Sequence, residues 1–126
     1  MKLIETADAP RPAGHYSQAV VANGFVFVAG ILPIVPATDG TRTIPDGIEA
    51  QMRQVFANLR AILTAAGSDL HKLTSVQIFV PQIELWGAVN AIYAELLGTH
   101  KPARTVVPCG PLHYGALVEL NAIATT

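Results

Sequence analysis

An arginine and a glutamate, Arg104 and Glu119, stand on either side of a turn-rich segment, Pro108–Gly115, near the end of the chain. The residues that flank this segment are rich in apolar and β-branched types and predict strands over 103–107 and 116–124. If these strands form a symmetric hairpin, Arg104 lies opposite Glu119, and directly opposed residues project from the same sheet face. We therefore expect a guanidinium and a carboxylate side by side in apolar surroundings.

Such a pair has two interpretations. A buried arginine on a strand needs a partner, so a structural ion pair would account for it. Alternatively, the planar fork of Arg104 binds the carboxylate of a substrate, and Glu119 acts as an acid or base or positions a water molecule. The two interpretations are compatible, because the ion pair could exist before a substrate arrives.

The remaining polar residues indicate no metal, cofactor or disulfide chemistry. The four histidines lack the spacing of metal ligands, although His15 and His113 are candidates to line a cleft. Cys109 is the only cysteine, which excludes a disulfide within the chain and favours a reducing, cytoplasmic setting. The first residues form no apolar segment of the kind that opens a signal peptide.

Composition narrows the partners further. The net charge is −1 and the eight basic residues are scattered, so we expect no nucleic acid and no membrane as partner. Only 13% of the residues are charged and 51% are hydrophobic. This balance favours burial of part of the surface in an oligomer, with an ordinary apolar domain as the alternative.

The expected elements follow from periodicity and turn residues. Asn23-Gly24 predicts a tight hairpin between two strands. Asp46 and Glu49 resemble a capping box that opens an apolar-faced helix, and Gly67 suits its end. A short, unplaced strand is expected between Pro33 and Pro45. The full prediction is strands over 16–22, 25–29, 73–80, 103–107 and 116–124, and helices over 46–66 and 83–97.

This order predicts one α+β domain over residues 1–126, a two-layer sandwich of a mixed sheet with two helices on one face. Each expected helix has only one apolar side, so one face of the sheet suffices for both. The other face also carries apolar residues, and a neighbouring subunit is the natural cover for it.

Several ordered segments resemble the RidA/YjgF family, and the likeness runs from about Gly14 to Ala124. They are Gly14-His15-Tyr16-Ser17-Gln18-Ala19-Val20, Phe25-Val26-Phe27-Val28-Ala29-Gly30, Glu49-Ala50-Gln51 with Asn58-Leu59, Val89-Asn90-Ala91-Ile92-Tyr93, and Lys101-Pro102-Ala103-Arg104 followed by Gly115-Ala116-Leu117-Val118-Glu119. The resemblance implies a chorismate-mutase-like subunit, a homotrimer with sites in clefts between subunits, and no cofactor. It also implies hydrolysis of 2-aminoacrylate and related enamine or imine acids to 2-keto acids and ammonia.

The resemblance also implies roles for single residues. Arg104 would hold the substrate carboxylate, Glu119 would orient or activate water, Tyr16 would line the pocket, and the backbone of Gly30 would approach the ligand. Ala29, Ile31 and Val106 occupy further substrate-binding positions.

Three residues depart from the family pattern. Ala29 stands where serine is usual, Val106 where many members have cysteine, and His15 where proline is usual. The first two make the expected pocket more apolar and bear on substrate range. They also motivate an alternative function, a non-catalytic trimeric module that binds small carboxylates or regulates a partner. An RNA-directed role, which some relatives' names suggest, finds no basic stripe or aromatic run here.

Overall fold

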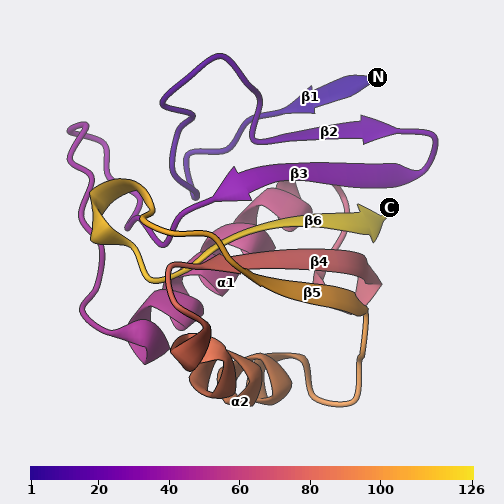
Figure 1. Ribbon diagram of the computed structural model, residues 1–126. Coiled ribbons are helices and arrows are strands. Elements are labelled where there is room, and N and C mark those ends of the chain that lie inside the picture. Colours follow the sequence, from indigo (N-terminus) through magenta and orange to yellow (C-terminus); the bar gives the residue numbers. More distant parts are fainter.

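The computed structural model describes all 126 residues and shows a six-stranded sheet in the order β1-β2-β3-β6-β4-β5 (Figure 1). Short 3₁₀ turns precede β4, α2 and β6. The elements are β1 (Lys2–Ile4), β2 (Ala19–Ala22), β3 (Phe25–Ile31), α1 (Ile48–Ala65), β4 (Leu73–Val80), α2 (Trp86–Leu97), β5 (Ala103–Pro108) and β6 (Glu119–Thr125).

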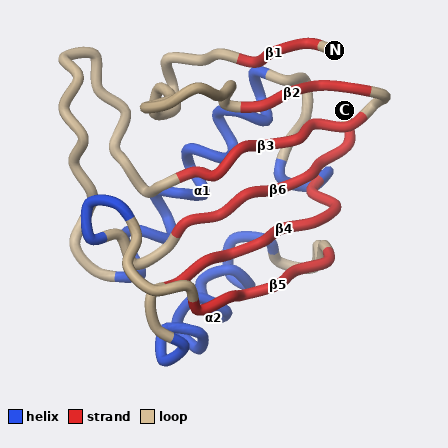
Figure 2. The backbone as a smooth tube through the Cα atoms, turned by 45° about the horizontal axis from the view of Figure 1, so that its top comes forward, coloured by secondary structure: helices blue, strands red, loops and turns tan.

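The sheet is mixed, and both helices cover one of its faces. Strands β4 and β5 pair in parallel and are joined through α2, whereas the other neighbouring strands are antiparallel. Turned so that the sheet faces the reader, the backbone shows α1 and α2 together behind it (Figure 2). The predicted α+β two-layer arrangement is therefore confirmed.

The hydrophobic core lies between the sheet and the helices. Met52, Val55 and Leu59 of α1 are fully buried against strand residues such as Val26 and Val76. These side chains recur at helical spacing on α1 and at every second position of the strands. Each contributes about 1.5–3 kcal/mol through burial of apolar surface, so this layer supplies the rigid base for the loops above it.

Local turn signals were partly correct. Asn23 and Gly24 both have positive φ, 52° and 80°, and form the expected hairpin between β2 and β3. The expected capping box at Asp46 is wrong: α1 begins at Ile48 after Gly47, whose φ of 85° redirects the chain and which makes no side-chain cap. Gly67, with φ of 78°, follows the end of the helix as expected.

One strand prediction is wrong, and one strand was not predicted. Residues 33–45 form no strand, and their one recorded backbone pairing joins Val35 N–H to the carbonyl of Thr43. The additional strand is β1 in the N-terminal arm, which pairs with β2. A three-residue edge strand has too short a pattern to distinguish it from an irregular arm.

The predicted C-terminal hairpin is wrong in a way that bears on function. Strand β5 pairs with β4, and β6 lies between β3 and β4, so Arg104 and Glu119 are not opposed. Arg104 aligns with Val76, whose buried side chain faces the helices. Glu119 aligns with Phe79, which lies an odd number of residues after Val76 on β4 and so faces the other side of the sheet. Within one subunit, Arg104 and Glu119 therefore project from opposite faces of the sheet.

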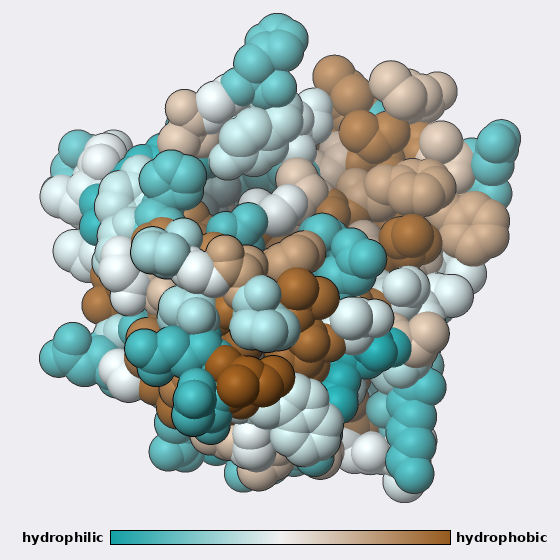
Figure 3. All heavy atoms as spheres, viewed as in Figure 1, coloured by the Kyte–Doolittle hydropathy of each residue, from teal (hydrophilic) through white to brown (hydrophobic).

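The face of the sheet that no helix covers retains exposed apolar side chains. Phe25 is 40% and Phe27 is 45% exposed on β3, and Leu3 of β1 is 62% exposed. In the hydropathy view, apolar surface gathers at the upper right, over the β1–β3 end of the molecule (Figure 3).

Candidate functional site between β3, the N-terminal arm and the turn before β6

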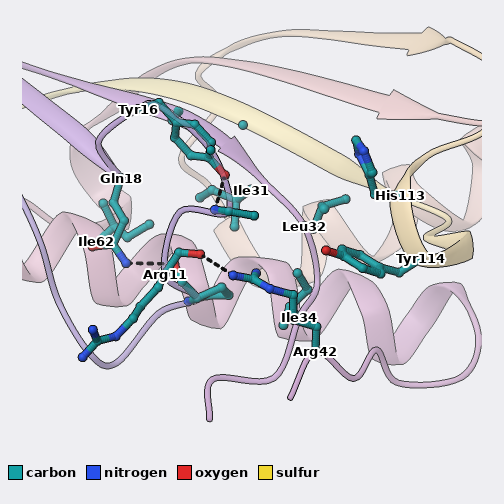
Figure 4. Close-up of a pocket in the computed structure, with 15 residues that line it drawn as sticks. Arg11, Tyr16, Gln18, Ile31, Leu32, Ile34, Arg42, Ile62, His113 and Tyr114 are labelled. Atoms are coloured by element: carbon teal, nitrogen blue, oxygen red, sulfur yellow. Dashed lines mark hydrogen bonds between the residues drawn. The ribbon is translucent and has the colours of Figure 1, made fainter. Parts of the chain in front are cut away.

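A cavity of about 280 Å³ lies where the end of β3 meets the N-terminal arm and the 3₁₀ turn before β6 (Figure 4). It contains four of the residues that the sequence placed at substrate-binding positions. Its lining is Pro10, Arg11, Ala13, Gly14, Tyr16, Gln18, Ala29, Gly30, Ile31, Leu32, Ile34, Arg42, Ile62, His113 and Tyr114.

The arm that forms one wall is fixed by a single buried glutamine. The Gln18 side chain, 4% exposed, accepts from the Thr6 N–H at 2.7 Å and donates to the carbonyls of Thr6 and Pro10 at 3.0 and 2.9 Å. These bonds satisfy both ends of a buried amide, which is costly to leave unpaired. They hold the irregular segment that carries Tyr16 against β3.

Glu119 reaches the cavity wall beside Gly30. The β3–β6 register shifts between Val28 and Ile31, and a Cβ atom on Gly30 would lie 2.6 Å from Oε2 of Glu119. Residue 30 must therefore lack a side chain for the carboxylate to occupy this place.

The Glu119 carboxyl is half-buried and has no ion-pair partner in the subunit, because the only ion pairs are those of Arg53. Burial raises the pKa of Glu119 above its usual 4.5, and the nearby His113 partly opposes this shift. A carboxyl with a raised pKa is suited to exchanging protons near neutral pH.

His113 and Tyr114 form the wall opposite the arm. Their rings lie 6.0 Å apart, and Tyr114 has a φ of 60°, a left-handed conformation that is uncommon outside glycine. His113 was a candidate to line a cleft from the sequence, and the structure places it in this cavity. His15 does not line it.

Arg104 lies elsewhere, on the helix side of the edge strand β5. Its Nη1 donates to Oδ1 of Asn90 at 2.9 Å, and its guanidinium lies 4.8 Å from the ring centre of Tyr93 and 5.6 Å from that of Trp86. It borders a separate hollow, which Asn90 and Lys101 also line. Aromatic faces and an amide hold the fork in place without neutralising it.

The predicted site residues therefore form two groups within one subunit. Tyr16, Ala29, Gly30 and Ile31 line the main cavity with Glu119 beside them, whereas Arg104 and the half-buried Val106 lie on β5. The structural ion pair expected between Arg104 and Glu119 is absent.

Sequence reasoning missed Arg11 and Arg42 in the cavity lining. Both come from irregular segments, where no periodic pattern indicates which side chains face inward. No three His, Cys, Asp or Glu side chains are grouped as metal ligands. None of the helices is both long and apolar enough to cross a lipid bilayer.

Known proteins share this sequence pattern and this architecture. Residues 6–126 match the family model described as Endoribonuclease L-PSP. A RutC family protein of Pyrococcus horikoshii is 40% identical over 123 residues, covering 98% of this chain and 96% of that protein. The crystal structure of RidA from the Antarctic bacterium Psychrobacter superposes with a TM-score of 0.93 at 31% identity over the full length of both chains.

The chain belongs to the RidA/YjgF family. Among its relatives is the chloroplastic Reactive Intermediate Deaminase A of Arabidopsis thaliana, 33% identical over 124 residues that make up 98% of this chain and 65% of that protein. Ala29, which stands where the family usually has serine, lines the cavity. A methyl group therefore occupies the place where serine would supply a hydroxyl. Val106 instead packs against the core from β5.

Proposed function

We propose that this protein is a deaminase that hydrolyses enamine and imine acids of the 2-aminoacrylate type to 2-keto acids and ammonia, at sites between the subunits of a homotrimer. The observation that carries the proposal is a pair of uncompensated charges at two hollows: a fixed guanidinium at Arg104 and a half-buried carboxyl at Glu119. Each is one half of a site for a small zwitterion-like acid.

Assembly supplies the missing half. Since Arg104 and Glu119 project from opposite sheet faces of one subunit, a complete site needs Arg104 of one copy beside Glu119 of another. The exposed edge of β5 and the uncovered apolar face that includes Phe27 support such packing. A head-to-tail contact of this kind closes into a ring when the rotation between successive copies closes, which is the case for the proposed trimer.

The chemistry follows from these two groups. Arg104 holds the substrate carboxylate by its fork and fixes the neighbouring imine carbon. An enamine first takes a proton on its terminal carbon to become the imine. Glu119 then accepts a proton from a water molecule as the water oxygen bonds to the imine carbon, and it returns this proton to the imine nitrogen. The hydroxyl proton of the resulting carbinolamine then passes, through Glu119, to the amino group as the C–N bond breaks and the C=O bond forms, which releases ammonia and the 2-keto acid.

The test is a coupled assay in which a dehydratase generates 2-aminoacrylate from serine and 2-keto acid formation is recorded. We expect the wild type to accelerate release, Glu119→Gln to lower the rate about 100-fold or more, and Arg104→Ala to raise KM and lower kcat/KM by a similar factor. Arg60→Ala is the matched control, because Arg60 is exposed and forms no ion pair.

Absence of acceleration by the wild type, or wild-type rates in Arg104→Ala, would overturn the proposal. Calorimetric binding of pyruvate without any turnover would select the alternative, a non-catalytic module that binds small carboxylates.

A further inference from the structure

Arg42 is one of two arginines that line the cavity beside Gly30, and it is distinct from Arg104, to which the substrate carboxylate is assigned. It comes from the segment between β3 and α1 and forms no ion pair. Its one recorded hydrogen bond runs from Nη2 to the carbonyl of Arg11 at 3.2 Å. A guanidinium has five N–H donors, so most of its hydrogen-bonding capacity is open.

The segment that carries Arg42 is anchored. Asn58, buried in α1, donates to the carbonyls of Leu32 and Ile34 at 3.1 and 2.9 Å. Farther along, Val35 N–H donates to the carbonyl of Thr43 at 2.9 Å, one residue beyond Arg42. These bonds fix both ends of the loop, so the cation is presented at a defined place.

Figure 4 shows how the two cavity arginines differ. The Arg42 side chain runs toward the Arg11 carbonyl in the middle of the group, beside Ile34, whereas the Arg11 side chain leads away from His113 and Tyr114. Arg42 is therefore the cation that a ligand within the cavity would meet.

Apolar residues separate this cation from the proposed reaction centre. Ile31, Leu32 and Ile34 follow Gly30, beside which Glu119 lies. A cavity of about 280 Å³ admits a small metabolite whose short carbon chain spans the apolar part. The positive charge of Arg42 at the far end favours an anionic group on the ligand, and the planar guanidinium matches the geometry of a carboxylate.

We propose that Arg42 forms a subsite for a second carboxylate, so that the preferred substrates are imine acids derived from acidic amino acids. This inference rests on the proposed function: Arg104 of a neighbouring subunit holds the first carboxylate, Glu119 serves the imine carbon, and the substrate side chain extends across Ile31 and Leu32 to Arg42.

A structural role for Arg42 makes a different prediction. If its bond to the Arg11 carbonyl only steadies the arm, removing the Arg42 side chain lowers the affinity for all ligands by the same factor or lowers the free energy of unfolding. Recognition of a second carboxylate changes only the ligands that carry one. The ratio of two affinities therefore separates the roles.

The experiment measures calorimetric binding of 2-keto acids, the class of the proposed products, to the intact oligomer; oxaloacetate is prepared fresh because it decarboxylates in water. Oxaloacetate is compared with 4-methyl-2-oxopentanoate and 2-oxoglutarate with 5-methyl-2-oxohexanoate, because each branched acid has an isopropyl group where its partner has the second carboxylate. For at least one pair we expect the wild type to favour the dicarboxylate by about 10-fold or more, as a charged hydrogen bond would give. Arg42→Ala should abolish that preference, so that the ratio of the two affinities falls to about one.

Two further variants sharpen the result. Arg42→Lys should keep part of the preference, because the charge remains while the fork is lost. Arg60→Ala should keep all of it. Equal affinities within both pairs in the wild type, or an equal loss for both members of a pair in Arg42→Ala, would overturn the subsite.

Parallel turnover of 2-aminoacrylate separates this inference from the proposed function. If the wild type hydrolyses 2-aminoacrylate but shows no dicarboxylate preference, the subsite is wrong and the deaminase stands. If it neither hydrolyses 2-aminoacrylate nor binds any keto acid, both fail.

Discussion

At Glu119, burial and a neighbouring histidine act on the same carboxyl in opposite directions. Burial raises the pKa of Glu119 because it disfavours the charged form, and His113 lowers it because an imidazolium stabilises a carboxylate. The proposed role needs the ionised carboxylate, so activity is present above this pKa and is lost as the pH falls through it.

Replacing His113 therefore moves the acid limb of the pH profile. In His113→Ala we expect the acid limb of kcat/KM to shift to higher pH, since a positive charge that lowers the pKa of Glu119 is removed. The measurement is kcat/KM from about pH 4, near the ordinary pKa of a carboxyl group, to about pH 8. His71→Ala is the control, because His71 is exposed and lies outside the cavity. A limb that stays in place or moves to lower pH would refute the coupling.

Residue types alone revealed only part of the site. The family motifs identified Tyr16 and Gly30, which line one cavity with His113, and Glu119, which lies beside Gly30. Nothing in the sequence indicated Arg42, since the inward direction of a loop side chain depends on distant anchors such as Asn58.

The irregular end of β3 is the element that sets the position of Glu119. In Gly30→Ala the new Cβ would meet Oε2 at 2.6 Å, and this atom is the end of a flexible side chain that can move. We expect unfolding free energy to change by less than about 2 kcal/mol while kcat/KM falls at least about 10-fold. Denaturant unfolding and the coupled assay measure the two effects.

Gly87→Ala provides the comparison, because a Cβ there meets nothing within 4 Å. That change should leave kcat/KM intact and stabilise α2 by about 0.5–1 kcal/mol. Full activity in Gly30→Ala would contradict the assigned place of the carboxylate.

The loop after β3 depends on α1 through Asn58. This side chain is 1% exposed, donates to two loop carbonyls and accepts from Gln54 at 3.0 Å. In Asn58→Ala both carbonyls lose their partner, and we expect a loss of about 2–4 kcal/mol in urea unfolding. Gln54→Ala removes one part-buried hydrogen bond and should lower the free energy of unfolding by less than about 1 kcal/mol. Equal losses in the two variants would count against this anchoring.

Pattern-based prediction at this scale succeeded where the signal was local. The Asn23-Gly24 hairpin and the apolar stripe of α1 each depend on residues that are close together in the sequence, and both are present. The pairing of β5 was mispredicted because an apolar strand pattern does not identify its neighbour. The α2 crossover allowed β5 to join β4 in parallel, which left β6 to pair with β3 and β4.

For the whole molecule, we propose the uncovered sheet face as a contact of the trimer. Phe27 is 45% exposed there, so Phe27→Lys should leave the fold of the subunit intact and dissociate the assembly. Sedimentation velocity would show monomers, and deaminase activity would fall with them. Ala57→Lys, at an exposed position of α1, should remain assembled. A trimeric Phe27→Lys protein would exclude this face as the contact.

The opposed projection of Arg104 and Glu119 has a genetic consequence. Co-expressed Arg104→Ala and Glu119→Gln chains, each inactive alone, would complement one another, because a hybrid ring contains some boundaries with an intact residue from each parent. With random mixing about one boundary in four would be complete. Chains that carry both substitutions would form no complete boundary with one another, so they would regain no activity.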